Sequence, residues 1–205
     1  MKQKLKKEEA AEVEEVEAME EEEVGDMEAE VEAEAVVEVE VEGQEGMEPE
    51  GMMRMSPLNC HPVLTSNFGG PHGDGFSDET MVKSGQKVLS INLRVGERVD
   101  AVILTVGATL FHGGGGGDLK TPLALAESEY ITSMEAHSGK HKGHTRIKYI
   151  KFTTNKGNFI EGGTRTDNIG TDTAKEGYQL SGFVGRDGDE LDMVGAIWTS
   201  IQAVV

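Results

Sequence analysis

Four carboxylates and a glycine lie close together near the end of the 205-residue chain. Residues 182–198 read GFVGRDGDELDMVGAIW and hold, within six positions, Asp187, Gly188, Asp189, Glu190 and Asp192. Glycine lets the main chain approach a ligand because it has no Cβ atom, so the N–H groups of Asp189 and Glu190 could donate to hydroxyls. A carboxylate fixed where a strand begins can accept from two neighbouring hydroxyls, at about 1.5–3 kcal/mol for each charge-assisted bond. The pattern predicts a sugar-binding loop with Asp192 as its acceptor.

Three other interpretations of this loop remain open. The structural one is a tight hairpin in which Asp192 caps its own turn. A pair of carboxylates is also typical of glycosidases, but a general acid needs a desolvated site, and four acids on one short loop are expected to be solvated. Calcium prefers oxygen ligands, yet the spacing does not match an EF-hand and neighbouring strand side chains point to opposite faces. We therefore expect no catalytic residue, no metal and no cofactor.

The elements that must position this loop are β-strands. Residues 87–95, KVLSINLRV, place Leu89, Ile91, Leu93 and Val95 on one face, as in a half-buried strand. Similar stretches follow, and Gly, Asn, Asp and Ser clusters separate them, including a predicted hairpin turn at residues 155–157. Among them are residues 98–107, 129–137, 146–157, 178–185 and 192–201. The sequence predicts an all-β, antiparallel fold with Phe152 and Trp198 in its core.

Glycine-rich loops recur after an apolar residue. They read FGGPHGDG from Phe68, FHGGGGGD from Phe111, IEGGTRTD from Ile160 and FVGRDGDELD from Phe183. Their spacing is irregular, but their similarity predicts pseudo-symmetric sheets, each closed by such a loop at a common end. The glycines of the second loop form either a second sugar-binding loop or a flexible turn: Gly113, Gly114, Gly115 and Gly116. We interpret IEGGTRTD as structural.

The charge of the chain divides it into two parts. Residues 1–60 hold 21 Asp and Glu against five Lys and Arg, a net of −16 out of −19. Such a segment, without aromatic residues over residues 1–50, is expected to be disordered and to attract basic proteins rather than nucleic acid. We predict an acidic low-complexity segment and linker at residues 1–64 and a folded domain at residues 65–205.

The sequence also suggests a compartment. There is no apolar run of the roughly 20 residues that a membrane span needs, and the basic start lacks the apolar region of a secretory signal. We expect an intracellular protein, or a secreted one if its true N-terminus differs. Cys60 is predicted to be a free thiol in the linker, since one cysteine cannot form an intramolecular disulfide.

A histidine-rich stretch, HSGKHKGHTRIK, begins at His137. His141 and His144 also lie in it, and three imidazoles could bind zinc. Lysine and arginine residues among them disfavour a cation, so we expect a solvated basic hairpin loop, which could contact the acidic segment.

Three stretches resemble the jacalin-related lectins, the β-prism I family. GDGFSDE (73–79) is similar to the family's N-terminal glycine followed by an aromatic residue and acids. RIKYIKFTTNKGNFIEGG (146–163) resembles its mid-domain hairpin, and residues 183–198 resemble the segment with its Gly-x-x-x-Asp sugar motif, here Gly188 to Asp192. The resemblance covers about 135–140 residues, a length usual for one domain. It implies three four-stranded antiparallel sheets with pseudo-threefold symmetry.

The same resemblance implies a metal-independent carbohydrate-binding module rather than an enzyme. Its site would combine Gly73 of the first loop with Asp189, Glu190 and Asp192 of the last. Because Gly73 does not begin the chain and the loop has no aromatic residue, the sequence resembles the uncleaved, mannose-binding branch. We expect neutral mannose- or glucose-type glycans as ligands, and poor tolerance of sulfated or sialylated ones at this loop.

A second hypothesis belongs to another class. The acidic segment could bind a basic protein partner, which would make the chain an interaction adaptor with the folded domain as its scaffold. Under either hypothesis, the chain could also associate with copies of itself as a homo-oligomer. The glycan specificity and the oligomeric state are not encoded in a recognisable pattern.

Overall fold

The computed structural model describes residues 61–203, and the predictions for residues 1–60, including Cys60, lie outside them. The described residues form fourteen strands, and they contain no helix long and apolar enough to cross a bilayer. The strands are β1 (Val63–Leu64), β2 (Phe68–Gly69), β3 (Asp74–Ser77), β4 (Ser90–Val95), β5 (Val99–Thr105), β6 (Thr109–Gly113), β7 (Asp118–Leu119), β8 (Leu123–Ala124), β9 (Ile131–His141), β10 (His144–Thr154), β11 (Phe159–Gly163), β12 (Asn168–Thr173), β13 (Tyr178–Asp187) and β14 (Leu191–Ser200).

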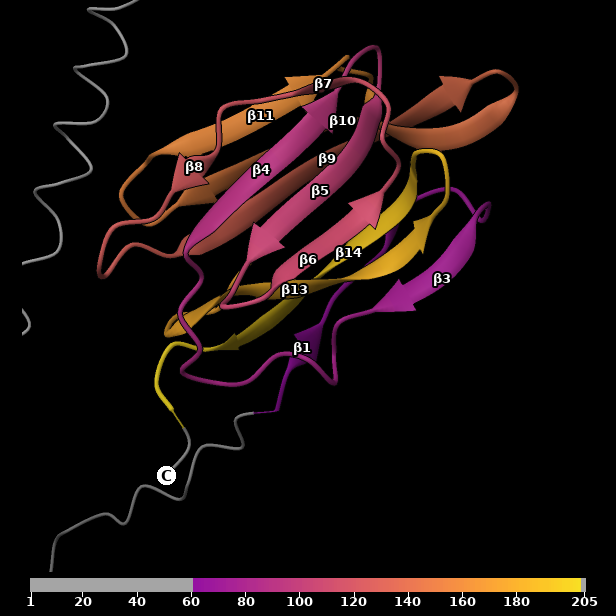
Figure 1. Cartoon of the computed structure of the whole chain (residues 1–205). Coiled ribbons are helices and arrows are strands. Elements are labelled where there is room, and N and C mark those ends of the chain that lie inside the picture. Colours follow the sequence, from indigo (N-terminus) through magenta and orange to yellow (C-terminus); the bar gives the residue numbers. More distant parts are fainter. Residues whose placement is uncertain (1–60, 204–205) are drawn as a thin grey trace, which may run out of the picture. The chain divides into compact units, whose positions relative to one another are not determined.

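The strands form three antiparallel sheets, as predicted (Figure 1). Sheet A has the order β1-β14-β13-β3 with β2 also on β14, sheet B has the order β6-β5-β4-β7 with β8 also on β4, and sheet C has the order β11-β10-β9-β12. Two short strands share one edge in sheets A and B, so each sheet is four strands wide. Sheet A combines strands from both ends of the described chain, whereas sheets B and C are each continuous in sequence. β1 begins before residue 65, inside the segment expected to be a linker.

Apolar side chains of all three sheets form one core. Phe152 and Trp198 are 0% and 1% exposed, which confirms their predicted positions. Ile91 and Leu93 are also fully buried, so the alternation seen in the sequence holds within β4. Leu89 is 50% exposed because β4 begins one residue later, at Ser90, and the prediction for this residue was wrong.

Each sheet contains a β-bulge in the second strand of its central hairpin, at the second residue of β14 and of β5 and at the fifth residue of β10. In sheet A, Asp192 is the extra residue between the paired positions Leu191 and Met193. Asp100 is the extra residue of β5 in sheet B, and Lys148 is the extra residue of β10 in sheet C. Bulges place one additional side chain in a strand and redirect it. The predicted pseudo-threefold symmetry therefore extends to these bulges, although the central hairpin of sheet C is longer than those of sheets A and B.

A glycine with positive φ lies against each bulge. Gly69, Gly113 and Gly163 have φ values of 113°, 118° and 94°. In each case an added Cβ would come within 2.2 Å of the carbonyl oxygen of the bulge residue. The next residue of each loop then donates its N–H to that same carbonyl, at 2.7 to 2.9 Å. Three of the glycine-rich loops seen in the sequence thus close the three sheets in the same way.

Glu129, just before β9, holds a loop together through its carboxylate. It accepts hydrogen bonds from Asn158 Nδ2 at 2.7 Å, Thr154 Oγ1 at 2.8 Å and the Ala126 N–H at 3.2 Å. The side-chain hydrogen bonds from Asn158 and Thr154, followed by the Ala126 N–H, lower the pKa of Glu129 below its usual value. The ionised form is therefore favoured in the folded state.

The Glu129 carboxylate should make the stability of the folded domain depend on pH in the acidic range. Because the folded pKa is lowered, its contribution is present above the usual glutamate pKa and is lost as the pH falls through the folded value. Glu129→Gln should lower the melting temperature at neutral pH and flatten its acid dependence, measured by circular dichroism. Glu127→Gln, at an exposed position two residues away, is the control. An unchanged acid dependence in Glu129→Gln would contradict this role.

Candidate carbohydrate-binding site

Asp192, the predicted acceptor, is buried at the bulge of β14. It is 2% exposed. One carboxylate oxygen forms an ion pair with Arg146 of β10, and the other lies beside Gly73, where an added Cβ would come within 2.7 Å of it. The structure thus brings Gly73 and Asp192 together, although they are more than 100 residues apart in sequence. A side chain at position 73 would collide with this carboxylate.

The Glu190 carboxylate is neutralised by two arginines from other sheets. Its Oε1 accepts from Arg146 Nε at 2.5 Å, and its Oε2 forms an ion pair with Arg98 of the β4–β5 turn. The side chain of Glu190 is 12% exposed. The expectation that all four acids are solvated was therefore wrong for Glu190 and Asp192, because arginines distant in sequence reach them. Only Asp189 has an exposed carboxylate on this loop.

The backbone of residues 188–190 carries the predicted donors. Gly188 is exposed with open space around it, and its N–H donates to the Glu190 carbonyl at 3.1 Å. The N–H groups of Asp189 and Glu190 donate to no backbone acceptor within residues 61–203. These two donors and the Asp192 carboxylate belong to the same turn, which is the donor and acceptor set that paired hydroxyls require.

The glycine run of residues 113–117 packs against this turn. The Gly113 N–H donates to Asp187 Oδ2 at 2.6 Å, and a Cβ on Gly114 would lie 2.0 Å from the Asp189 carbonyl oxygen. Gly116 lies over the Asp100 carboxylate, and Arg94 Nε donates to the Gly116 carbonyl at 2.8 Å. Gly115 alone has open space around it. The run is thus a close-packed loop rather than a freely flexible turn, while a sugar-binding role for Gly113 to Gly116 stays a prediction.

Burial has the largest effect on the ionisation of Asp192. It raises the pKa of this carboxyl above its usual value, and Arg146 opposes the shift. Two histidines also lie near the carboxylate: His72, which precedes Gly73, and His144 at the start of β10. Their rings meet edge to face with centroids 4.4 Å apart, and His144 Nδ1 lies 3.2 Å from His72 Nε2.

A second bulge aspartate, Asp100, also lies beside an arginine and closely approaching glycines, and it was missed in the sequence. Asp100 is 2% exposed and pairs with Arg98 at 3.1 Å. Gly116 and Gly117 approach its two carboxylate oxygens, as Gly73 approaches Asp192. The spacing Gly96-x-x-x-Asp100 repeats that of Gly188-x-x-x-Asp192, so this signal was present in the chain.

The histidines of the basic stretch do not act together. His137 is 1% exposed, lies 2.9 Å from Glu135 Oε1 and accepts from the Thr166 N–H at 3.0 Å. The expectation of a solvated loop was wrong for this residue, which belongs to β9. Within residues 61–203, no three of His, Cys, Asp and Glu are grouped as metal ligands.

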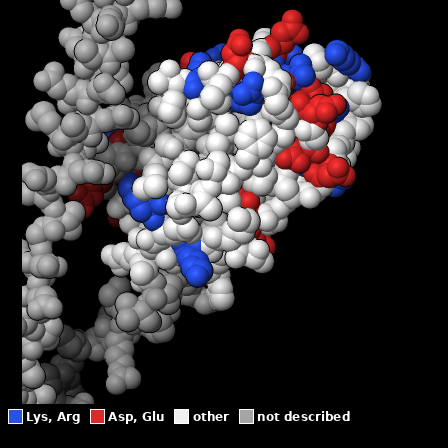
Figure 2. Space-filling model, in the orientation of Figure 1, with Lys and Arg blue, Asp and Glu red and all other residues white. Residues whose placement is uncertain are grey.

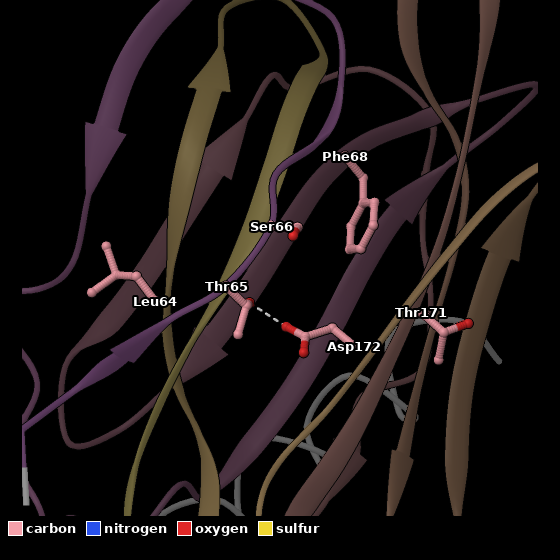
Figure 3. A pocket seen from close by; sticks show the side chains of 6 residues that line it. All are labelled: Leu64, Thr65, Ser66, Phe68, Thr171 and Asp172. Atoms are coloured by element: carbon pink, nitrogen blue, oxygen red, sulfur yellow. Dashed lines mark hydrogen bonds between the residues drawn. The ribbon is translucent and has the colours of Figure 1, made fainter.

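A hollow of about 490 Å³ lies elsewhere, between the first strands and β12 (Figure 3). It is lined by Leu64, Thr65, Ser66, Phe68, Thr171 and Asp172, none of which was a predicted site residue. The Asp172 carboxylate already accepts from Thr65 Oγ1, drawn as a dashed line, and from Trp198 Nε1 at 3.0 Å. These bonds join sheets A and C, and we assign this hollow no ligand.

Comparison with known proteins identifies the family. The model of the jacalin-like lectin domain matches residues 65–197. The secreted RxLR effector protein 19 of Plasmopara viticola is 33% identical over 140 residues, which make up 63% of this chain and 77% of that protein.

Solved structures share the fold. Malaysian banana lectin superposes with a TM-score of 0.61 at 26% identity, covering 68% of this chain and 99% of the lectin. A mannose-specific jacalin-related lectin from Morus nigra, solved with mannose, gives 0.58 at 22% identity, covering 70% and 98%. The three antiparallel sheets are thus those of a β-prism, and the family consists of carbohydrate-binding proteins without catalytic activity. The chain belongs to the jacalin-like lectin family.

Proposed function

We propose that the protein binds neutral mannose- or glucose-type glycans at the turn of residues 188–192. The observation that carries this proposal is the juxtaposition of Gly73, the Asp192 carboxylate and the two N–H groups of Asp189 and Glu190. Two donors and one carboxylate match a pair of neighbouring hydroxyls. A carboxylate has about four lone-pair sites, so hydroxyls could share Asp192 with Arg146.

The preference for neutral sugars follows from the charges at the turn. Arg98 and Arg146 already neutralise Glu190, and the exposed carboxylate of Asp189 would repel an anionic group placed beside it. The name of the Morus nigra lectin gives mannose as the ligand of that protein, which is consistent with the same class of ligand here.

We propose Asp100, together with the loop of residues 113–117, as a second site of the same kind. Its carboxylate stands at the equivalent bulge of sheet B, and two glycines approach it from the neighbouring loop. In this second site the loop of residues 113–117 would lie beside Asp100, as the loop that contains Gly73 lies beside Asp192.

Calorimetric titration of the full chain with methyl α-mannoside and methyl α-galactoside, with EDTA present, tests the function. We expect the mannoside to bind with a dissociation constant of about 1 mM, or about −4 kcal/mol, as for a shallow monosaccharide site. The galactoside should bind at least about tenfold more weakly, and EDTA should have no effect. If a folded sample binds neither sugar, the turn is a structural hairpin. That result would favour the hypothesis that the acidic segment binds a basic protein partner.

A further inference from the structure

The third corner of the prism has the same backbone frame but the opposite charge. Lys148 occupies in sheet C the bulge position that Asp192 occupies in sheet A and Asp100 in sheet B. Its carbonyl oxygen accepts from the Thr164 N–H at 2.7 Å, and Gly163 closes the loop as its counterparts do. The frame is thus kept, while its bulge residue is a cation.

The lysine side chain is held in place and has no acidic partner. Its stem lies along β9, since an added Cβ on Gly139 would come within 3.0 Å of Lys148 Cγ and 3.2 Å of Thr166. No carboxylate of residues 61–203 lies within ion-pair distance of Lys148, Lys140 or Lys142. Three cations of one hairpin are therefore without counter-ions in the described part of the chain, and two of them, Lys148 and Lys142, lie near His141.

His141 adds an unused polar atom between these cations. Its Nε2 is buried and has no hydrogen-bond partner among the described residues. Burial lowers the pKa of His141, and the charges of Arg98, Lys148 and Lys142 lower it further. A neutral imidazole in this position does not add to the repulsion among the neighbouring cations.

Carboxylates around the corner are few or already paired. Glu161 and Glu135 pair with Arg165, and Glu97 on the adjoining turn favours the charged form of His141. Asp167 is exposed on the neighbouring loop. In Figure 2, acidic and basic side chains lie together along the upper and right-hand edges of the face in view, and isolated basic side chains lie toward its lower left.

We propose that this corner, formed by Lys148, Lys142, His141 and the loop of residues 163–166, binds the anionic group of an acidic saccharide. Lysine ammonium groups carry three donors and pair with sulfate esters and carboxylates alike. The frame shared with the two proposed sugar corners favours a saccharide over other anions. The loop IEGGTRTD, interpreted from the sequence as structural, then also serves a ligand. The choice of a saccharide rests on the proposed sugar-binding function, whereas the binding of an anion at this corner does not.

The test uses the full chain and two immobilised probes at low ionic strength, with saturating methyl α-mannoside in solution. One probe is a sulfated heparin-derived oligosaccharide, and the other is an oligogalacturonate of the same length, so the two arms distinguish sulfate from carboxylate. Lys148→Glu should weaken binding to at least one probe about tenfold or more. Lys156→Glu is the matched control, because Lys156 is exposed in the β10–β11 turn and the change in net charge is the same. It should change binding less than about twofold.

The outcomes separate this inference from the proposed neutral-sugar function. Binding that depends on Lys148 supports the inference even if methyl α-mannoside itself fails to bind. Equal losses in the two variants indicate diffuse attraction and overturn it, as does the absence of binding to both probes.

A synthetic peptide of residues 8–23 is offered separately. If only the peptide binds in a Lys148-dependent manner, the ligand is an acidic polypeptide, and the saccharide assignment is wrong.

Discussion

Asp192→Asn is expected to remove measurable binding of methyl α-mannoside. The amide keeps the shape of the side chain but loses the charge, and two charge-assisted bonds contribute about 1.5–3 kcal/mol each. A site near ~1 mM has only about −4 kcal/mol in total, so the loss leaves binding below detection by calorimetry. Asp189→Asn is the matched control, because Asp189 is exposed and its proposed contact with the sugar is made by its N–H group, which the substitution keeps. Its affinity should stay within about twofold.

The same variant separates binding from folding. Burial raises the pKa of Asp192, so its ionised form is disfavoured in the folded state. The contribution of Asp192 to the free energy of unfolding therefore increases as the pH falls through its folded pKa. For the same reason, removing the charge with Asp192→Asn should not lower the melting temperature at neutral pH. The affinity of the unmodified protein for the sugar should change in the opposite sense, because the sugar needs the ionised carboxylate. This affinity should fall as the pH falls, and the fall should begin at a higher pH than it would for an exposed aspartate. Unimpaired mannoside binding in a folded Asp192→Asn sample would exclude Asp192 as the acceptor.

Gly113→Ala should cause a large loss of stability. Position 113 has a φ of 118°, and a Cβ would lie 2.1 Å from the Asp100 carbonyl oxygen, so the variant combines backbone strain with a collision in a packed loop. The strain costs about 1–2 kcal/mol and the collision about 1–3 kcal/mol, so a loss near 3 kcal/mol is expected. Chemical denaturation of the full chain measures it.

Gly107→Ala isolates the first of these two costs. Gly107 has a similar φ of 97°, but nothing lies within 4 Å of an added Cβ. This variant should lose only about 1–2 kcal/mol. Equal losses at positions 107 and 113 would mean that the loop moves aside freely, and that it does not hold the turn of residues 188–192 in place.

The fold was predictable from local sequence, whereas the charges of the site were not. Strand alternation and glycine turns are local patterns, so they predicted antiparallel sheets, and the recurring loops predicted their symmetry. Arg98 and Arg146 reach Glu190 only because three sheets converge, and nothing near Glu190 in the sequence indicates either contact. For the same reason the acids were expected to be solvated, and His137 was placed in a solvated loop although β9 buries it.

The bulge residues, too, were only partly recognisable from the sequence. Gly188-x-x-x-Asp192 could be recognised from spacing, and Gly96-x-x-x-Asp100 could have been. Lys148 has no comparable glycine spacing before it, so its equivalence to the two aspartates emerges only from strand register. Register depends on which residue each strand leaves unpaired, and that choice is made by the packing of the whole sheet.

Sheet A has a consequence for the order of folding. Its strands β1, β2 and β3 come from the start of the domain, and β13 and β14 come from the end, so its pairings are the most distant in sequence. Contacts of that kind form late because a long loop must close before they are made. During synthesis, sheets B and C can assemble first. The turn that bears Asp192 is completed only when β14 leaves the ribosome, so a nascent chain cannot bind a ligand at this turn until the last strand of sheet A has been made.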